Sequence, residues 1–291
     1  MTEQFATIAI TGKPSDTAVV ETIQRIAHHL GQKGRRILVD ADIVDDDPAW
    51  QRVPHHALAD SADVIISVGG DGTLLHTARL AVDHDVPILG INRGRLGFLV
   101  DVSPSRLEEL DRILGGDYIE DVRDLLHAEI RRDGKVLSSA IALNDVVLYK
   151  WNTARMIDFT VYVNQELITD YRADGFIVAT PTGSTAYAMA SGGPIMHPSV
   201  GAMVLLPISP HTLSNRPLVI GSENEIEIEV SPDALDRVGI SCDGQADLGL
   251  PPDARLTIRR HKRKVRIMHP PRYRYFDILR AKLRWGDIKL R

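Results

Sequence analysis

The stretch ADVIISVGGDGTLLHTAR, residues 62–79, joins a continuous apolar run to a glycine-rich turn and then to a segment with helical spacing. An apolar run of this kind is typical of a strand that is covered on both faces of a parallel sheet. Three further apolar runs predict neighbouring strands: ATIAITG (6–12), RRILVDA (35–41) and VPILGIN (86–92). Because helical patterns separate these strands, we expect a doubly wound, Rossmann-like α/β sheet.

The helical patterns beside this sheet have recognisable ends. Apolar residues recur at helical spacing from Thr17 to Leu30, and Gly31 follows as a stop. Ser103 and Pro104 are expected to open another helix that runs to Leu114, with the serine hydroxyl as its cap and the proline in its first turn.

After about Gly116 the pattern changes to strand, turn and strand. Asp133-Gly134 and Asn164-Gln165 each separate two strand-like runs, and NEIEIEV (224–230) alternates strictly, as a half-exposed antiparallel strand does. ARLTIRRHKRKVRIMH (254–269) is expected to form a further hairpin, with its basic centre as a solvated turn. This half of the chain is therefore predicted to be mainly β and sandwich-like.

These patterns divide the chain into two expected domains. Residues 1–116 are predicted to form the α/β domain that carries the GGDG loop, and residues 117–271 the β-rich domain. An amphipathic pattern from Tyr275 to Trp285 predicts a terminal helix that returns to the first domain, so residues 272–291 are assigned there.

Composition excludes several classes of protein. The 291 residues are 44% hydrophobic and 25% charged, with no uninterrupted apolar run long enough for a membrane span. A net charge of −5 disfavours a dedicated nucleic-acid binder. The N-terminus lacks the pattern of a secretion signal, and the single Cys242 cannot form an internal disulfide, so we expect a cytoplasmic protein. His28-His29 and His55-His56 lack the spacing of a zinc site.

The GGDG loop has two interpretations that its own residues leave open. Glycines let backbone N–H groups approach a ligand, and a helix that begins near Thr73 would add a positive dipole end, so the loop could hold phosphate. The alternative is a tight turn in which Asp71 caps that helix. A second stretch, residues 170–198, contains a strand, GFIVATP, and then TGSTAY, whose small residues and hydroxyls would let a ligand lie against the backbone. Its alternative is an ordinary Ser/Thr helix cap.

Seven motifs in order make the chain resemble bacterial NAD kinases. They are GGDG (69–72), NRGRLGFL (92–99), Asn144-Asp145, RADGFIVATPTGSTAY (172–187), GGPIMHP (192–198), PHTLSNRPLVI (210–220) and CDGQ (242–245). The GGDG loop alone is shared with diacylglycerol, sphingosine and phosphofructo-kinases, but TGSTAY is not.

The resemblance implies an ATP-dependent transferase of NADP biosynthesis. Family members move the γ-phosphoryl group of ATP, or in some members of polyphosphate, onto the 2′-hydroxyl of NAD's adenosine ribose. Asp71 then corresponds to the general base, Gly69, Gly70 and Gly72 to amide donors for phosphate, and His76 to a cationic position of the nucleotide loop; an exposed helix histidine is the alternative for His76. Mg²⁺ is expected to be carried by phosphates and water, without a protein metal site.

The resemblance also assigns NAD binding to the β-rich domain. The implied residues are Asn144, Asp145, Arg155, Arg172, Asp174, Thr182, Thr185, Ala186, Tyr187, Ala188, Met189, Ala190 and Gln245. Asp145 departs from the family, where this acid is often Glu, so its reach is one methylene shorter. A homodimer or homotetramer is implied. Two other functions stay open: a non-catalytic NAD(P)-binding sensor on the same scaffold, and a lipid kinase with a GGDG loop.

Overall fold

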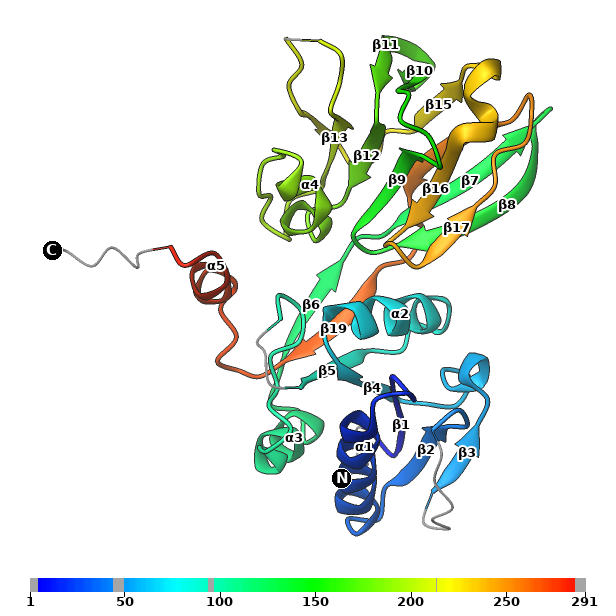
Figure 1. The fold of residues 1–291 in the computed structure, drawn as a ribbon. Helices are drawn as coiled ribbons and strands as arrows, with labels where there is room; N and C mark the ends of the chain where they lie inside the picture. Colours follow the sequence, from blue (N-terminus) through cyan, green and yellow to red (C-terminus); the bar gives the residue numbers. More distant parts are fainter. Residues whose placement is uncertain (1–4, 44–49, 94–96, 213, 286–291) are drawn as a thin grey trace, which may run out of the picture. The chain divides into compact units, whose positions relative to one another are not determined.

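The computed structural model describes residues 5–43, 50–93, 97–212 and 214–285. The chain divides into two compact units, Met1–Val122 with Val265–Arg291, and Arg123–Lys264 (Figure 1). From the sequence the first boundary was expected after residue 116 and the second after residue 271.

The first unit contains a seven-stranded sheet in the order β3-β2-β1-β4-β5-β19-β6. Its strands are β1 (Thr7–Gly12), β2 (Arg36–Asp40), β3 (Gln51–Val53), β4 (Val64–Gly69), β5 (Ile88–Asn92), β6 (Ile119–Arg123) and β19 (Val265–His269). The pairs from β3 through to β19 are parallel, with Ile8 of β1 opposite Val64 of β4. The doubly wound α/β sheet predicted from the sequence is confirmed, and β4 is buried along its whole length.

The first unit also contains helices, which lie between and after these strands in the chain. They are α1 (Thr17–Gly31), α2 (Asp71–Ala81), α3 (Leu107–Leu114) and α5 (Tyr275–Leu283), with short 3₁₀ turns η1 (His55–Ala57) and η2 (Val82–His84). Apolar side chains of α1 and α3 share one buried cluster with the strands. The predicted start of α3 is wrong: its N-cap is Arg106, because Val102 still pairs with Ile91 and the Ser103 hydroxyl is hydrogen-bonded to Ser105.

The second unit consists of two six-stranded sheets, ordered β11-β10-β15-β18-β7-β8 and β14-β13-β12-β9-β16-β17. The first holds β7 (Leu126–Arg132), β8 (Lys135–Ala142), β10 (Ile157–Val163), β11 (Glu166–Ala173), β15 (Ile226–Val230) and β18 (Arg255–Arg260). The second holds β9 (Asp145–Lys150), β12 (Gly175–Ala179), β13 (Ala202–Ile208), β14 (Leu218–Gly221), β16 (Val238–Cys242) and β17 (Ala246–Leu248). Short turns complete it: η3 (Gly183–Thr185), α4 (Tyr187–Ala190) and η4 (Pro232–Arg237).

One apolar cluster joins both sheets, so the predicted sandwich is confirmed. Phe159 of β10 and Phe176 of β12 meet in this core with ring centroids 5.8 Å apart. Asn164 and Gln165 both have positive φ, which fits the predicted hairpin turn between β10 and β11.

The hairpin predicted over residues 254–269 is wrong. β18 pairs with β15 and β7 in the second unit, whereas β19 pairs in parallel with β5 in the first. In the basic segment between them the chain leaves the second unit and re-enters the first. This agrees with the expectation that the C-terminal segment returns to the first domain. Among the described residues, none of the helices is long and apolar enough to cross a membrane.

Candidate functional site

The GGDG loop connects the end of β4 to the start of α2. Gly70 is the N-cap residue, and α2 begins at Asp71. Gly69 must lack a side chain, because a Cβ there would lie 2.3 Å from the Thr73 hydroxyl oxygen. The helix has no side-chain cap, so the interpretation of Asp71 as the helix cap is wrong.

The Asp71 carboxylate instead binds the loop that follows β5. It accepts hydrogen bonds from the backbone N–H groups of Phe98, at 2.9 Å, and Leu99, at 3.1 Å. A Cβ on Gly97 would lie 2.1 Å from one carboxylate oxygen, so this glycine is needed for the close approach. Two motifs of the sequence, GGDG and the end of NRGRLGFL, therefore form one structure; residues 94–96 of that motif lie outside the described residues. Each carboxylate oxygen keeps a second lone pair that can accept from a substrate hydroxyl.

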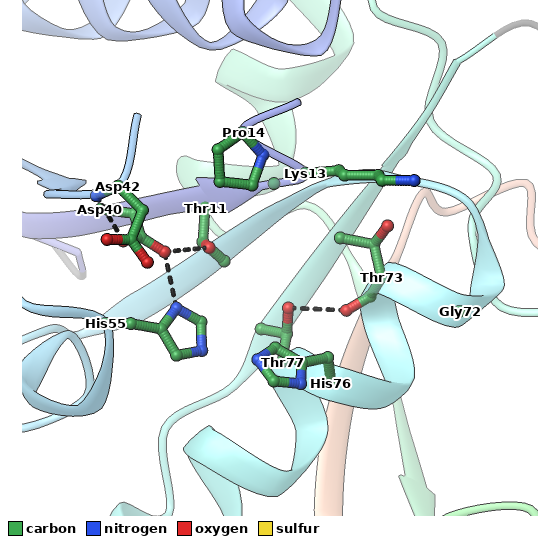
Figure 2. A pocket seen from close by; sticks show the side chains of 11 residues that line it. Thr11, Lys13, Pro14, Asp40, Asp42, His55, Gly72, Thr73, His76 and Thr77 are labelled. Atoms are coloured by element: carbon green, nitrogen blue, oxygen red, sulfur yellow. Dashed lines mark hydrogen bonds and ion pairs between the residues drawn. The ribbon is translucent and has the colours of Figure 1, made fainter. Parts of the chain in front are cut away.

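A cavity of about 440 Å³ lies beside the first turns of α2, at the carboxyl ends of β1 and β2. His76 lines it and stacks on His55, with ring centroids 4.7 Å apart and an angle of 26° between the planes. Figure 2 shows Asp40 between His55 and Thr11; its carboxylate lies 2.6 Å from the ring nitrogen and 2.8 Å from the hydroxyl. His55 and Asp40 were not among the predicted site residues, since neither stands in a motif.

The pKa values of the two histidines in this cavity are shifted in opposite directions. The hydrogen bond to Asp40 raises the pKa of His55 above its ordinary value, despite the burial of the ring. Burial, and then the charge of His55, lower the pKa of His76. Burial alone would raise the pKa of Asp40, but the hydrogen bond from His55 and two further hydrogen bonds outweigh it and leave that pKa below its ordinary value. The charged form of the Asp40–His55 pair is thereby stabilised.

In the second unit, Asn144 lies at a bend between β8 and β9, and Asp145 begins β9. The chain changes sheets at this bend, since β8 and β9 belong to different sheets. The carboxylate of Asp243 holds the bend: it accepts the backbone N–H groups of Leu143 (2.9 Å) and Asn144 (2.7 Å). Asp243 belongs to the CDGQ motif, of which only Gln245 was a predicted site residue. Positive φ at Asp243 and Gly244 marks the turn, a signal that the Asp-Gly pair could have provided.

The TGSTAY segment packs directly against this bend. The Thr180 hydroxyl donates to the carbonyl oxygen of Leu143 (2.6 Å) and accepts from the N–H of Gly183 (3.1 Å). The buried Ser184 hydroxyl accepts from the N–H of Met196, in the GGPIMHP motif, at 2.9 Å. Neither η3 nor α4 has a side-chain cap, so the interpretation of these hydroxyls as an ordinary helix cap is wrong. They connect three motifs instead.

A cavity of about 600 Å³ opens beside the bend. Four predicted residues line it together: Asn144, Asp145, Ala186 and Tyr187. Tyr149 and Asp243 line it as well and were not predicted. An aromatic ring, short side chains and carboxyl and amide groups around one cavity suit a base with an attached ribose.

The remaining predicted residues do not line this cavity. Thr182 is buried and accepts a hydrogen bond from Arg123 (3.0 Å), Asp174 pairs with Lys150 (2.7 Å), and Ala188 is buried. Gln245 follows the Asp243 turn, and its backbone N–H donates to the carbonyl oxygen of Cys242. Other predicted positions are exposed or half-buried around the same loops and strands: Arg155, Arg172, Thr185, Met189 and Ala190.

Asp145 is almost fully buried in the wall of this cavity, with 5% of its surface exposed. Burial, and then the nearby carboxylate of Asp243, raise the pKa of Asp145 to about 7. Near neutral pH this carboxyl group therefore holds a proton for much of the time and can donate a hydrogen bond as well as accept one.

This raised pKa predicts a pH-dependent stability. The folded protein retains a proton that the unfolded chain releases from about pH 4 upward, so the Asp145 contribution to the free energy of unfolding falls as the pH rises towards 7. Asp145→Asn is neutral and nearly isosteric, and we expect its Tm to exceed that of the parent increasingly from about pH 5 to about pH 8. Thermal unfolding across this range measures the difference; parallel pH profiles for the two proteins would contradict it.

Comparison with known proteins places the motifs of the first unit and those of the second unit in one family. The model of the ATP-NAD kinase N-terminal domain matches residues 8–118, and that of the C-terminal domain matches residues 143–270. An NAD kinase of Halorhodospira halophila is 51% identical over 97% of this chain and 94% of its own length. The chain belongs to the NAD kinase family.

Other relatives agree with this placement. The NAD kinase of Ectopseudomonas mendocina is 42% identical over 98% of both chains. Yeast NADH kinase, solved with NADH, has a TM-score of 0.87 at 22% identity, over 98% of this chain and 92% of its own, and shows the same fold. An NAD kinase from Archaeoglobus fulgidus, solved with ATP, has a TM-score of 0.72 at 28% identity, over 96% and 98% of the two chains. The kinase is thus an ATP-dependent phosphotransferase with NAD kinase activity, as its sequence predicted.

Proposed function

We propose that this kinase transfers the γ-phosphoryl group of ATP to the 2′-hydroxyl of the adenosine ribose of NAD, giving NADP, with Asp71 as the general base. The observation that supports this role is the pair of backbone hydrogen bonds that fixes the Asp71 carboxylate at the start of α2. A fixed carboxylate within hydrogen-bond reach of the hydroxyl accepts its proton as the new O–P bond forms.

Phosphate binding is assigned to the loop that carries Asp71. Gly70 and Gly72 lie at the start of α2, where the positive end of the helix dipole stabilises phosphate oxygens. Gly69 allows the turn, and His76 lies on the following turn of the helix. The N-terminus of α2 would offset part of the negative charge of the migrating phosphoryl group. His76, whose pKa is lowered, would serve there as a neutral hydrogen-bond donor rather than as a cation.

NAD binding is assigned to the cavity of the second unit. We place the adenosine against Tyr187 and Ala186, with the side chains of Asn144 and Asp145 hydrogen-bonded to its polar atoms. The protonated form of Asp145 can donate to a ring nitrogen or a hydroxyl oxygen, which offsets the shorter reach of Asp compared with Glu. The other assigned contacts, Arg155, Arg172, Asp174, Thr182, Thr185, Ala188, Met189, Ala190 and Gln245, rest on their motif positions.

Mg²⁺ is proposed to arrive with ATP, because phosphate oxygens and water suit its octahedral coordination. Within the part of the chain that the structure describes, no three His, Cys, Asp or Glu side chains form a group that could hold a metal ion. Bound to the phosphates of the nucleotide, Mg²⁺ would neutralise part of their charge. Use of polyphosphate as a donor, a cytoplasmic location and a homodimeric or homotetrameric assembly remain expectations.

The deciding experiment is an assay for NADP with purified protein, NAD, ATP and Mg²⁺. We expect NADP to accumulate in proportion to enzyme and to require both substrates. Folded protein that binds NAD yet makes no NADP with ATP or polyphosphate would support the sensor instead. Phosphate incorporation into diacylglycerol, tested in parallel, would support the lipid kinase.

A further inference from the structure

His269, the last residue of β19, is a fully buried histidine with a carboxylate beside each of its ring nitrogens. Its Nδ1 lies 3.2 Å from an oxygen of Asp101, in the segment after β5, and its Nε2 lies 3.5 Å from an oxygen of Asp121 in β6. The Tyr273 ring stacks on the imidazole, with ring centroids 3.8 Å apart and 13° between the planes. Side chains from three separate segments of the first unit therefore meet on this one ring.

This arrangement favours the charged form of His269. A neutral imidazole has one N–H group and can donate to only one of the two carboxylates, whereas the imidazolium ion donates to both. Burial of the ring alone would lower the pKa of His269, but the hydrogen bonds and charges of Asp101 and Asp121 outweigh burial and raise that pKa above its ordinary value. The charged histidine can thus bind both carboxylates at once.

Asp101 belongs to the loop that holds the Asp71 carboxylate. Phe98 and Leu99, whose backbone N–H groups bind that carboxylate, stand just before Asp101 in the chain. The residue after Asp101 is bridged to the backbone of β5. The loop is therefore anchored twice, by its backbone to β5 and by the Asp101 side chain to His269 of β19.

We propose that His269 is a positioning residue: held between Asp101 and Asp121, it fixes the loop that orients the Asp71 carboxylate. The inference rests on the proposed function, in which Asp71 takes up the proton of the ribose hydroxyl. Proton transfer depends on the geometry of the base, and a misplacement of about 1 Å can lower the rate about 10²-fold. Because His269 is fully buried, it acts through the loop and without contact with either substrate.

Replacement of His269 by Gln, which carries no charge, tests this role. We expect kcat to fall roughly 10- to 100-fold, while the KM for NAD and the KM for ATP stay within about twofold, because the base is displaced and the binding groups are not. His29→Gln is the matched control: His29 of α1 also pairs with an aspartate, Asp111 of α3, at 3.0 Å, but neither lies in the loop. Its kcat should stay near that of the parent.

A gentler variant serves if His269→Gln does not fold. Asp101→Asn keeps the size of the side chain and removes its charge, which weakens the hydrogen bond from His269. We expect kcat to fall in the same direction, again with little change in either KM.

A double variant tests whether the effect passes through Asp71. In Asp71→Asn the base is already absent, so the addition of His269→Gln should lower kcat by less than about twofold, far from the additive behaviour of independent sites. The full loss of the single variant, repeated in this background, would show that His269 acts elsewhere and would overturn the proposal.

Amide hydrogen exchange at Phe98 and Leu99 reports on the loop independently of activity. Exchange should be faster in His269→Gln and Asp101→Asn than in the parent. If the parent makes no NADP, or if Asp71→Asn turns over as the parent does, the proposed function fails, and the exchange rates alone decide whether His269 holds the loop. Unchanged exchange at both amides, or an active parent whose kcat His269→Gln retains, would overturn the proposal.

Discussion

Replacement of Asp71 by Asn should lower kcat roughly 10²–10⁴-fold, the usual contribution of a general base, with the KM for NAD little changed. The amide cannot take up the ribose hydroxyl proton. It also offers only one acceptor oxygen, so one of the two N–H donors, Phe98 or Leu99, loses its partner. NADP formation under saturating NAD and ATP measures the change. A kcat equal to that of the parent would remove Asp71 from the mechanism.

A second variant separates the position of this carboxylate from its chemistry. Gly97→Ala keeps the carboxylate but places a Cβ 2.1 Å from one of its oxygens, so the side chain must move. Because the displaced atoms belong to the end of a side chain, we expect kcat to fall with little loss of Tm. Gly31→Ala is the matched control, since a Cβ at Gly31 meets nothing within 4 Å.

Gly183→Ala should damage NAD binding far more than its size suggests. An added Cβ would lie 2.0 Å from the carbonyl oxygen of Asn144 and 2.4 Å from the carbonyl carbon. Backbone atoms cannot swing away as a side chain can, so either the bend at Asn144 or the TGSTAY turn must shift. We expect a KM for NAD at least about tenfold higher, and a loss of stability of roughly 1–3 kcal/mol, the range for overpacked sites.

The control for this variant lies in the same unit. Gly249→Ala adds the same methyl group where nothing lies within 4 Å, and it should leave both the KM for NAD and the Tm near those of the parent. Calorimetric NAD titration and thermal unfolding of both proteins measure the two effects. Equal NAD affinity in Gly183→Ala and the parent would show that the contact between the two motifs does not position the ligand.

The sequence predicted those elements whose formation depends on residues close together in the chain. The buried run of β4 and the helical spacing of α1 are visible in any short window of the chain, and both elements form where expected. The pairing of β19 has no local cause. Its residues alternate as a hairpin strand would, and only their parallel contact with Ile88 and Leu89 of β5 decides that they leave the second unit.

The candidate site divides in a similar way. Asp71 and Tyr187 lie in motifs, so the sequence could select them, although the carboxylate contacts of Asp71 depend on a loop 27 residues further along the chain. Asp243 accepts hydrogen bonds from residues about a hundred positions earlier in the chain. His55 is hydrogen-bonded to Asp40 and stacks on His76. Such contacts depend on tertiary packing, and residue spacing does not encode them.

The order of strands also has a consequence for biosynthesis. β6 and β19 are neighbours in the first sheet, yet the entire second unit lies between them in the chain. On the ribosome, the second unit is a contiguous segment and can complete its sandwich as soon as it has emerged. The first unit must wait with the edge of β5 unpaired until residues 265–269 have been synthesised. The part of the kinase that is translated first is therefore the last to finish folding.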